Sequence, residues 1–66
     1  MRITMKDARI NARISQTEIA RRLGVTSGAV SQWEKGTSAI TARQLERFCE
    51  IVGVSIGDII IPKPLS

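Results

Sequence analysis

The residue types in this chain favour hydrogen bonding and charge pairing over covalent or metal chemistry. The 66 residues include no histidine and a single cysteine, Cys49. A zinc site needs several Cys or His ligands, and a catalytic nucleophile needs an adjacent base. We therefore predict that the protein is not an enzyme and uses no metal or other cofactor. Cys49 is interpreted as a small buried apolar residue, with a redox role as the alternative.

Polar side chains gather on one side of the segment from Ser27 to Lys35. Val30 and Trp33 are three residues apart, so in a helix they share one face, which would pack on the core. The other side of that helix carries Ser27, Gly28, Ser31, Gln32 and Lys35. Trp33 could instead stack on a nucleic-acid base, but its place on the Val30 face favours a core position.

Charge and size narrow the classes of protein further. The net charge is +4 and the isoelectric point is about 10.3, which favours an anionic partner, with nucleic acid ahead of a membrane surface. Ordinary solubilising charge is the alternative. We predict one domain over residues 1–66, with a short apolar, proline-containing tail at 61–66. No apolar run approaches the ~20 residues of a membrane span, and no signal peptide is evident, so we expect a cytoplasmic protein.

Two short helices joined by a tight turn should position the polar segment. Ser15 is an N-cap for a helix that begins at Gln16, and Glu18 three residues later completes the pattern of a capping box. Gly24 favours the end of that helix. Thr26 is an N-cap for the next helix, over about 27–35, which should end at glycine 36.

Further capping signals predict three more helices around this pair. Thr4 can cap a first helix that runs to about residue 12. Thr41 and Gln44 form a second capping box, ahead of a helix that runs to about residue 52. Ser55 can cap a fifth helix, which Pro62 would stop. The predicted fold is therefore all-α, a compact bundle of five short helices, with a helix-turn-helix motif at the second and third.

The chain from about residue 5 to 60 resembles the phage repressor/Cro (lambda-repressor-like) helix-turn-helix family. The segments SQTEIARRLGV and VSQWEKG carry the resemblance. The matching positions are Gln16, Ile19, Ala20, Leu23, Gly24, Val25, Val30 and Trp33. Family members are usually dimeric repressors that bind operator DNA, so the resemblance implies sequence-specific binding of double-stranded DNA.

The resemblance makes the segment at 27–35 the recognition helix, whose N-terminal half faces base edges in a major groove. We expect the bases to be read by four residues: Ser27, Gly28, Ser31 and Gln32. Gln32 is the strongest candidate, because its amide can bond to N6 and N7 of adenine together. Gly28 departs from many members, which carry a larger side chain there, so DNA shape could contribute more than direct contacts.

The resemblance also implies contacts to the DNA backbone and one internal ion pair. The expected phosphate contacts are Gln16, Thr17, Lys35, Thr37, Ser38 and Arg43, with a plain solvated surface as the alternative for several of them. Backbone N–H groups at the start of the second helix form a ready phosphate site. In the family, the residue matching Gln16 bonds a DNA phosphate and also supports the recognition helix. Arg9 falls on the inward face of the first helix, where an unpaired charge is costly, and in the family it pairs with the residue matching Glu34. The alternative is two exposed charges that do not meet.

The apolar residues near the C-terminus suggest how two copies could associate. Ile59, Ile60, Ile61 and Leu65 are too many apolar groups for a short exposed end, so some should pack on the core and others could form a two-fold dimer contact. We expect a homodimer at least on DNA, with no membrane contact and no small-molecule ligand. Two alternatives are a protein-interaction module and the antitoxin of a toxin pair, either of which would dock through this tail.

Overall fold

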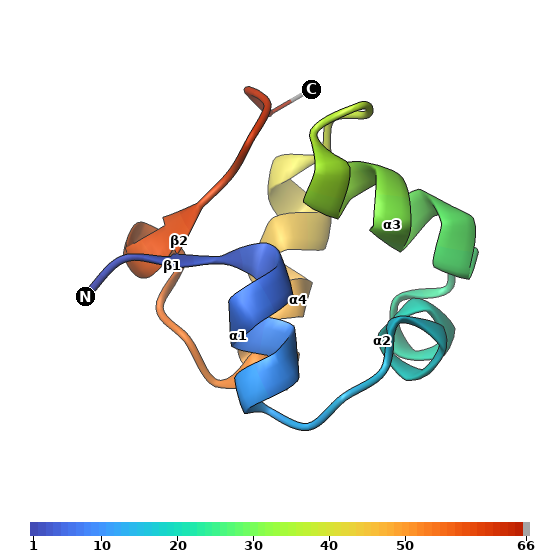
Figure 1. Cartoon of the computed structure of the whole chain (residues 1–66), viewed down its shortest axis with the longest axis horizontal. Coiled ribbons are helices and arrows are strands. Elements are labelled where there is room, and N and C mark those ends of the chain that lie inside the picture. Colours follow the sequence, from blue (N-terminus) through green and yellow to red (C-terminus); the bar gives the residue numbers. More distant parts are fainter. Residues whose placement is uncertain (66) are drawn as a thin grey trace.

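The computed structural model describes residues 1–65, and the helix-turn-helix lies at one side of it (Figure 1). The α-helices are α1 (Met5–Asn11), α2 (Gln16–Leu23), α3 (Ser27–Lys35) and α4 (Ala42–Val52). A 3-10 helix, η1 (Ile56–Asp58), follows α4, and two short strands are β1 (Ile3–Thr4) and β2 (Ile59–Ile60). The class is mostly helical, as predicted, with four α-helices in the described part instead of five.

Side-chain caps set where the helices begin. The Thr4 hydroxyl accepts from the N–H of Asp7 at 3.1 Å, and Thr41 with Gln44 forms a full capping box. The box predicted at Ser15 is only half formed. Ser15 accepts from the N–H of Glu18 at 3.0 Å, but the Glu18 carboxylate bonds to arginines on its own helix instead of returning to the cap.

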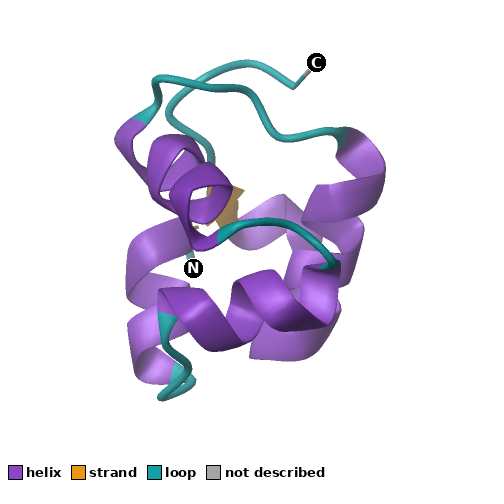
Figure 2. Cartoon of the chain, turned by 90° about the vertical axis from the view of Figure 1, so that its right-hand side faces the viewer, coloured by secondary structure: helices purple, strands orange, loops and turns teal. Residues whose placement is uncertain are grey.

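The turn between α2 and α3 has the geometry that the sequence predicts. Gly24 ends α2 with a φ of 72°, and Thr26 caps α3 by accepting from the N–H of Ala29 at 3.1 Å. In Figure 2, α2 runs across the view while α3 is seen nearly end-on in front of the rest of the chain. The turn therefore places the first residues of α3 at the outer side of the molecule.

The core joins α4 to the helix-turn-helix and explains why α3 is held firmly. Phe48, Met5, Ile19 and Val30 are the largest side chains that are fully buried. Trp33 is 5% exposed, so its predicted place in the core is correct. Burial of such side chains supplies about 1.5–3 kcal/mol each, so the inner face of α3 is strongly fixed.

The fifth helix of the prediction is wrong. Ser55 makes no side-chain cap, and the segment forms only the three-residue η1 before the chain becomes extended in β2. β2 pairs in parallel with β1, so that Ile3 lies opposite Ile59 and Thr4 opposite Ile60. The start of the chain is therefore tied to the segment that follows η1.

The tail after β2 turns back toward the end of α3. A Cβ built on Gly36 would lie 3.0 Å from the Cβ of Pro62, so the two residues are in close contact. Both views show the tail beside the segment that follows α3 (Figures 1 and 2). The tail thus covers the C-terminal end of α3 and does not project freely.

Candidate nucleic-acid interface

The outer face of α3 presents most of the side chains predicted to read bases. Ser27, Gly28 and Gln32 are exposed, and Ser31 is half-buried. A Cβ added at Gly28 would meet only the Thr26 hydroxyl, at 3.8 Å, so packing within the chain does not require glycine there. These positions therefore carry a glycine, short hydroxyl side chains and one amide, all of which can approach base edges.

The N-terminal end of α2 offers free donors beside that face. The N–H of Glu18 bonds to the Ser15 hydroxyl and the N–H of Ile19 bonds to the Ser15 carbonyl. Among the described residues, no hydrogen bond uses the N–H groups of Gln16 or Thr17. These two N–H groups, at the positive end of the helix dipole, can both donate to the oxygens of one phosphate group.

The predicted ion pair between Arg9 and Glu34 is present and joins α1 to α3. The Arg9 Nε donates to Glu34 Oε2 at 2.7 Å and its Nη2 donates to Oε1 at 3.2 Å. The two side chains are only 10% and 4% exposed. Arg9 Nη1 also donates to the carbonyl of Ile14 at 3.0 Å, ahead of α2. Glu34 accepts a further bond from the Gln16 Nε2 at 2.9 Å. Gln16 was expected to support the recognition helix, but its partner there was not named.

The remaining phosphate candidates lie around the C-terminal end of α3. Lys35 and Arg43 are exposed and make no ion pair within residues 1–65, so their charges are available to an anion. Ser38 is half-buried. Thr37 donates both its hydroxyl and its backbone N–H to the Gln32 carbonyl, at 3.3 and 3.0 Å. Thr37 would have to release its hydroxyl bond to donate it to a phosphate.

Arginines on the outer side of α2 are held by an acid of the same helix. Glu18 bonds to Arg21 at 2.6 Å and to Arg22 at 2.7 Å. The hydrogen bonds from Arg21 and then Arg22 lower the pKa of Glu18 from 4.5 to about 2. Arg47 of α4 donates to the Arg22 carbonyl at 3.2 Å and so ties α4 to the end of α2. The spacing of Glu18 from the two arginines, three and four residues, was the signal available in the sequence.

The residues predicted as a dimer contact are not equally accessible. Ile59 is 7% exposed and pairs with Ile3, so it belongs to the core of the chain, and its assignment to a dimer contact needs correction. Ile60 and Ile61 are half-buried, and Leu65 is 42% exposed. A contact between copies through this region would therefore rest on the last three of these residues.

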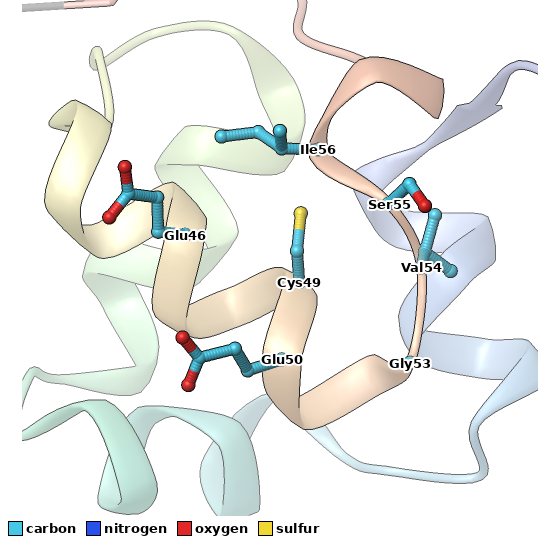
Figure 3. Close-up of a pocket in the computed structure, with 7 residues that line it drawn as sticks. All are labelled: Glu46, Cys49, Glu50, Gly53, Val54, Ser55 and Ile56. Atoms are coloured by element: carbon cyan, nitrogen blue, oxygen red, sulfur yellow. The ribbon is translucent and has the colours of Figure 1, made fainter.

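A shallow groove elsewhere has a different character. It lies between α4 and residues 53–56, and the Cys49 sulfur points into it beside Glu46 and Glu50 (Figure 3). Burial raises the pKa of the Cys49 thiol, which opposes thiolate formation. None of the candidate DNA contacts lines this groove. Residues 1–65 hold no cluster of acid, His or Cys side chains placed for a metal ion, and no helix among them could cross a membrane.

Comparison with known proteins agrees with this arrangement. Searches of curated proteins and of solved structures gave no match. A family model described as helix-turn-helix matches residues 5–59, which span α1 through η1 and contain every candidate contact to bases and phosphates. The chain therefore belongs to the repressor-like helix-turn-helix family, whose members are sequence-specific DNA-binding transcription regulators.

Proposed function

We propose that the protein is a Cro-like transcriptional repressor that binds a near-palindromic operator as a homodimer. The observation that carries this proposal is the outer face of α3, where a polar surface lies at the edge of the molecule while the opposite face is buried in the core. A major groove is about 12 Å wide and admits one such helix. Repression would follow when the bound dimer occupies a promoter.

Within the complex, each candidate residue has a role set by its chemistry. Gln32 would read one base pair through its amide, with Ser27, Ser31 and the bare backbone at Gly28 beside it. Gln16 and Thr17 would bind a phosphate through the N-terminal end of α2. Lys35, Arg43, Ser38 and, after reorientation, Thr37 would contact phosphates near the C-terminal end of α3.

The size of the molecule is compatible with two copies on one face of DNA. The principal extents are 28 × 25 × 19 Å. Half-sites one helical turn apart have centres separated by about 34 Å, so two copies side by side can each place α3 in a successive major groove. Ile60, Ile61 and Leu65 are the candidates for the contact between them. We further propose that the protein acts in the cytoplasm on the nucleoid, as a phage or prophage regulator and not as an enzyme.

The alternative is a protein-interaction module or an antitoxin that docks through the apolar tail. The partial exposure of Ile61 and Leu65 supports this alternative, because it leaves apolar surface to which a partner can dock. Salt dependence separates the two, because counterion release weakens DNA binding steeply with salt while apolar docking changes little.

The test is a salt titration of DNA affinity together with a promoter reporter. Two cationic candidates in each subunit, Lys35 and Arg43, would neutralise about four phosphates per dimer, giving a slope of log affinity against log salt near −3.6. A reporter that carries the operator at its promoter should be silenced. A slope near zero would contradict DNA binding through phosphate contacts. A reporter that stays active while the protein is bound would contradict repression.

A further inference from the structure

The contact between Gln16 and Glu34 is the feature that neither the fold nor the ion pair explains. Arg9 and Glu34 would form the same bidentate pair without it. Gln16 instead directs its amide nitrogen to the carboxylate at 2.9 Å, although it is only half-buried and could turn toward water. The contact links the first residue of α2 to the last turn of α3.

The chemistry of the carboxylate fixes which way this amide faces. An ionised Glu34 can only accept hydrogen bonds, so Gln16 must present Nε2 and not its oxygen. Nε2 carries two hydrogens, and Glu34 uses one of them. The second hydrogen stays available on the same nitrogen, beside the free backbone N–H groups of residues 16 and 17. A phosphate oxygen is also only an acceptor, so this is the orientation it requires.

Glu34, which holds the Gln16 amide, is itself held in place by Arg9, and the two side chains together carry almost no net charge. Glu34 is 4% exposed and is held at both oxygens by Arg9, which is in turn bonded to the Ile14 carbonyl. A long polar side chain loses conformational freedom when it binds a ligand, and an anchored one has already lost it. The Arg9 charge also offsets the carboxylate, which would otherwise repel a nearby phosphate.

We propose that Glu34 is a positioning residue that holds the Gln16 amide nitrogen in place for one DNA phosphate in each half-site, while Arg9 offsets its charge. The inference rests on the proposed function, specifically on the phosphate contact of Gln16. It assigns to Glu34 a role in DNA affinity that acts through another side chain, in addition to its role in holding α1 on α3.

A double-mutant cycle on DNA affinity tests the proposal. Gln16→Ala should weaken binding to the operator about tenfold in the otherwise unchanged protein, the effect of one hydrogen bond to a charged group. In a Glu34→Gln background, where the new amide can offer oxygen or nitrogen, the same change should cost at most about twofold. Glu18→Gln is the matched control, because it removes the same charge without touching Gln16, and there the tenfold effect should persist.

A second readout separates positioning from simple destabilisation. Operators that carry one uncharged methylphosphonate at a time should reveal a single position where the unchanged protein loses affinity and Gln16→Ala does not. Glu34→Gln should also lose sensitivity at that position. A merely structural Glu34 would lower the melting temperature and leave the sensitive position unchanged, and this result would overturn the proposal.

The outcomes distinguish failure of the inference from failure of the proposed function. A tenfold effect of Gln16→Ala in both backgrounds overturns the role of Glu34 and leaves the phosphate contact standing. No effect of Gln16→Ala in the unchanged protein overturns both that contact and the inference, while a steep salt slope would still support operator binding.

If Glu34→Gln does not fold, NMR of the unchanged protein supplies the test. One side-chain amide proton of Gln16 should already be protected in free protein, and operator should shift the other one downfield. Equal shifts of both protons, or none, would overturn the proposal.

Discussion

Gln32 is the one amide side chain on α3, and it lies exposed on the face opposite Val30 and Trp33. Its neighbours on that face are short hydroxyl groups and a glycine, which offer few competing contacts. Most of the discrimination at one base pair should therefore depend on this single residue, because a bidentate contact contributes about 1–3 kcal/mol.

Gln32→Ala should lose about 1–3 kcal/mol on the preferred operator and relax specificity at one base pair per half-site. The measurement is affinity for a set of operators with each base pair replaced in turn. Lys35→Ala is the control, since losing a phosphate contact weakens all sequences alike and lowers the salt slope by about 1 in each subunit. Unchanged preference at every position would remove Gln32 from the set of base-reading residues.

Glu18 provides a prediction in pH. Its folded-state pKa is lowered to about 2 by Arg21 and Arg22, while the unfolded chain titrates near 4.5. A lowered pKa stabilises the fold above pH 4.5, and this stabilisation is lost as pH falls from about 4.5 toward 2. Glu18→Gln should therefore flatten the decline in melting temperature over that range, although screening of an exposed pair keeps the effect small.

The matched control for that experiment is Glu50→Gln, which removes the same charge from a carboxylate without an ion pair in residues 1–65. It should leave the shape of the pH profile close to that of the unchanged protein. If the two variants gave the same profile, the interaction of Glu18 with the arginines would not hold in solution.

At the scale of elements, the end of α3 depends on a contact with the tail. Gly36 and Gly53 end their helices with nearly equal φ values of 79° and 74°. A Cβ at Gly36 would lie 3.0 Å from Pro62, whereas a Cβ at Gly53 would meet nothing within 4 Å. The two positions therefore share the same backbone strain and differ in packing.

We expect Gly53→Ala to cost about 1 kcal/mol of folding free energy, the penalty of a left-handed conformation for a residue with a side chain. Gly36→Ala should cost clearly more, because Pro62 must also move. Urea unfolding midpoints of the two variants measure the difference. Equal costs would show that the tail does not rest against α3 in solution.

The starts of helices could be predicted where the capping residue lies next to the helix in the sequence. Thr4, Thr26 and Thr41 each cap the helix that the sequence assigns to them, because each hydroxyl accepts from an N–H only three residues later. The box at Ser15 failed in part because Glu18 had competing partners three and four residues ahead. The left-handed Arg13, with a φ of 60°, has no signal in its residue type.

Contacts between residues far apart in the sequence could not be predicted from local patterns, and only the family resemblance indicated some of them. The ion pair of Arg9 and Glu34 spans 25 positions and came from the resemblance. The resemblance also implied that Gln16 supports the recognition helix, but it did not name Glu34, 18 positions away, as the partner. The fifth helix was wrong because pairing of Ile3 with Ile59 competes with helical spacing. No local pattern encodes such a pairing.

At the scale of the whole molecule, the candidate DNA contacts lie on one side, and the remaining elements pack behind α3 and fix its position. β1, near the start of the chain, pairs with β2, and this sheet lies across α1 and α4 from the outer side of α3 (Figure 1). The exposed residues of α3, the start of α2 and the two exposed cations Lys35 and Arg43 supply the candidate contacts to DNA. This arrangement leaves Ile60, Ile61 and Leu65 as the candidates for a contact between copies.

Selection from a random duplex library at about physiological salt tests most directly whether two copies read one operator through α3. We predict an enriched near-palindrome with half-sites about one helical turn, ~34 Å, apart. Repeating the selection with Gln32→Ala should relax one symmetric pair of positions. Enrichment of no sequence, with only weak binding that salt abolishes, would contradict the claim and leave the basic charge without a specific role.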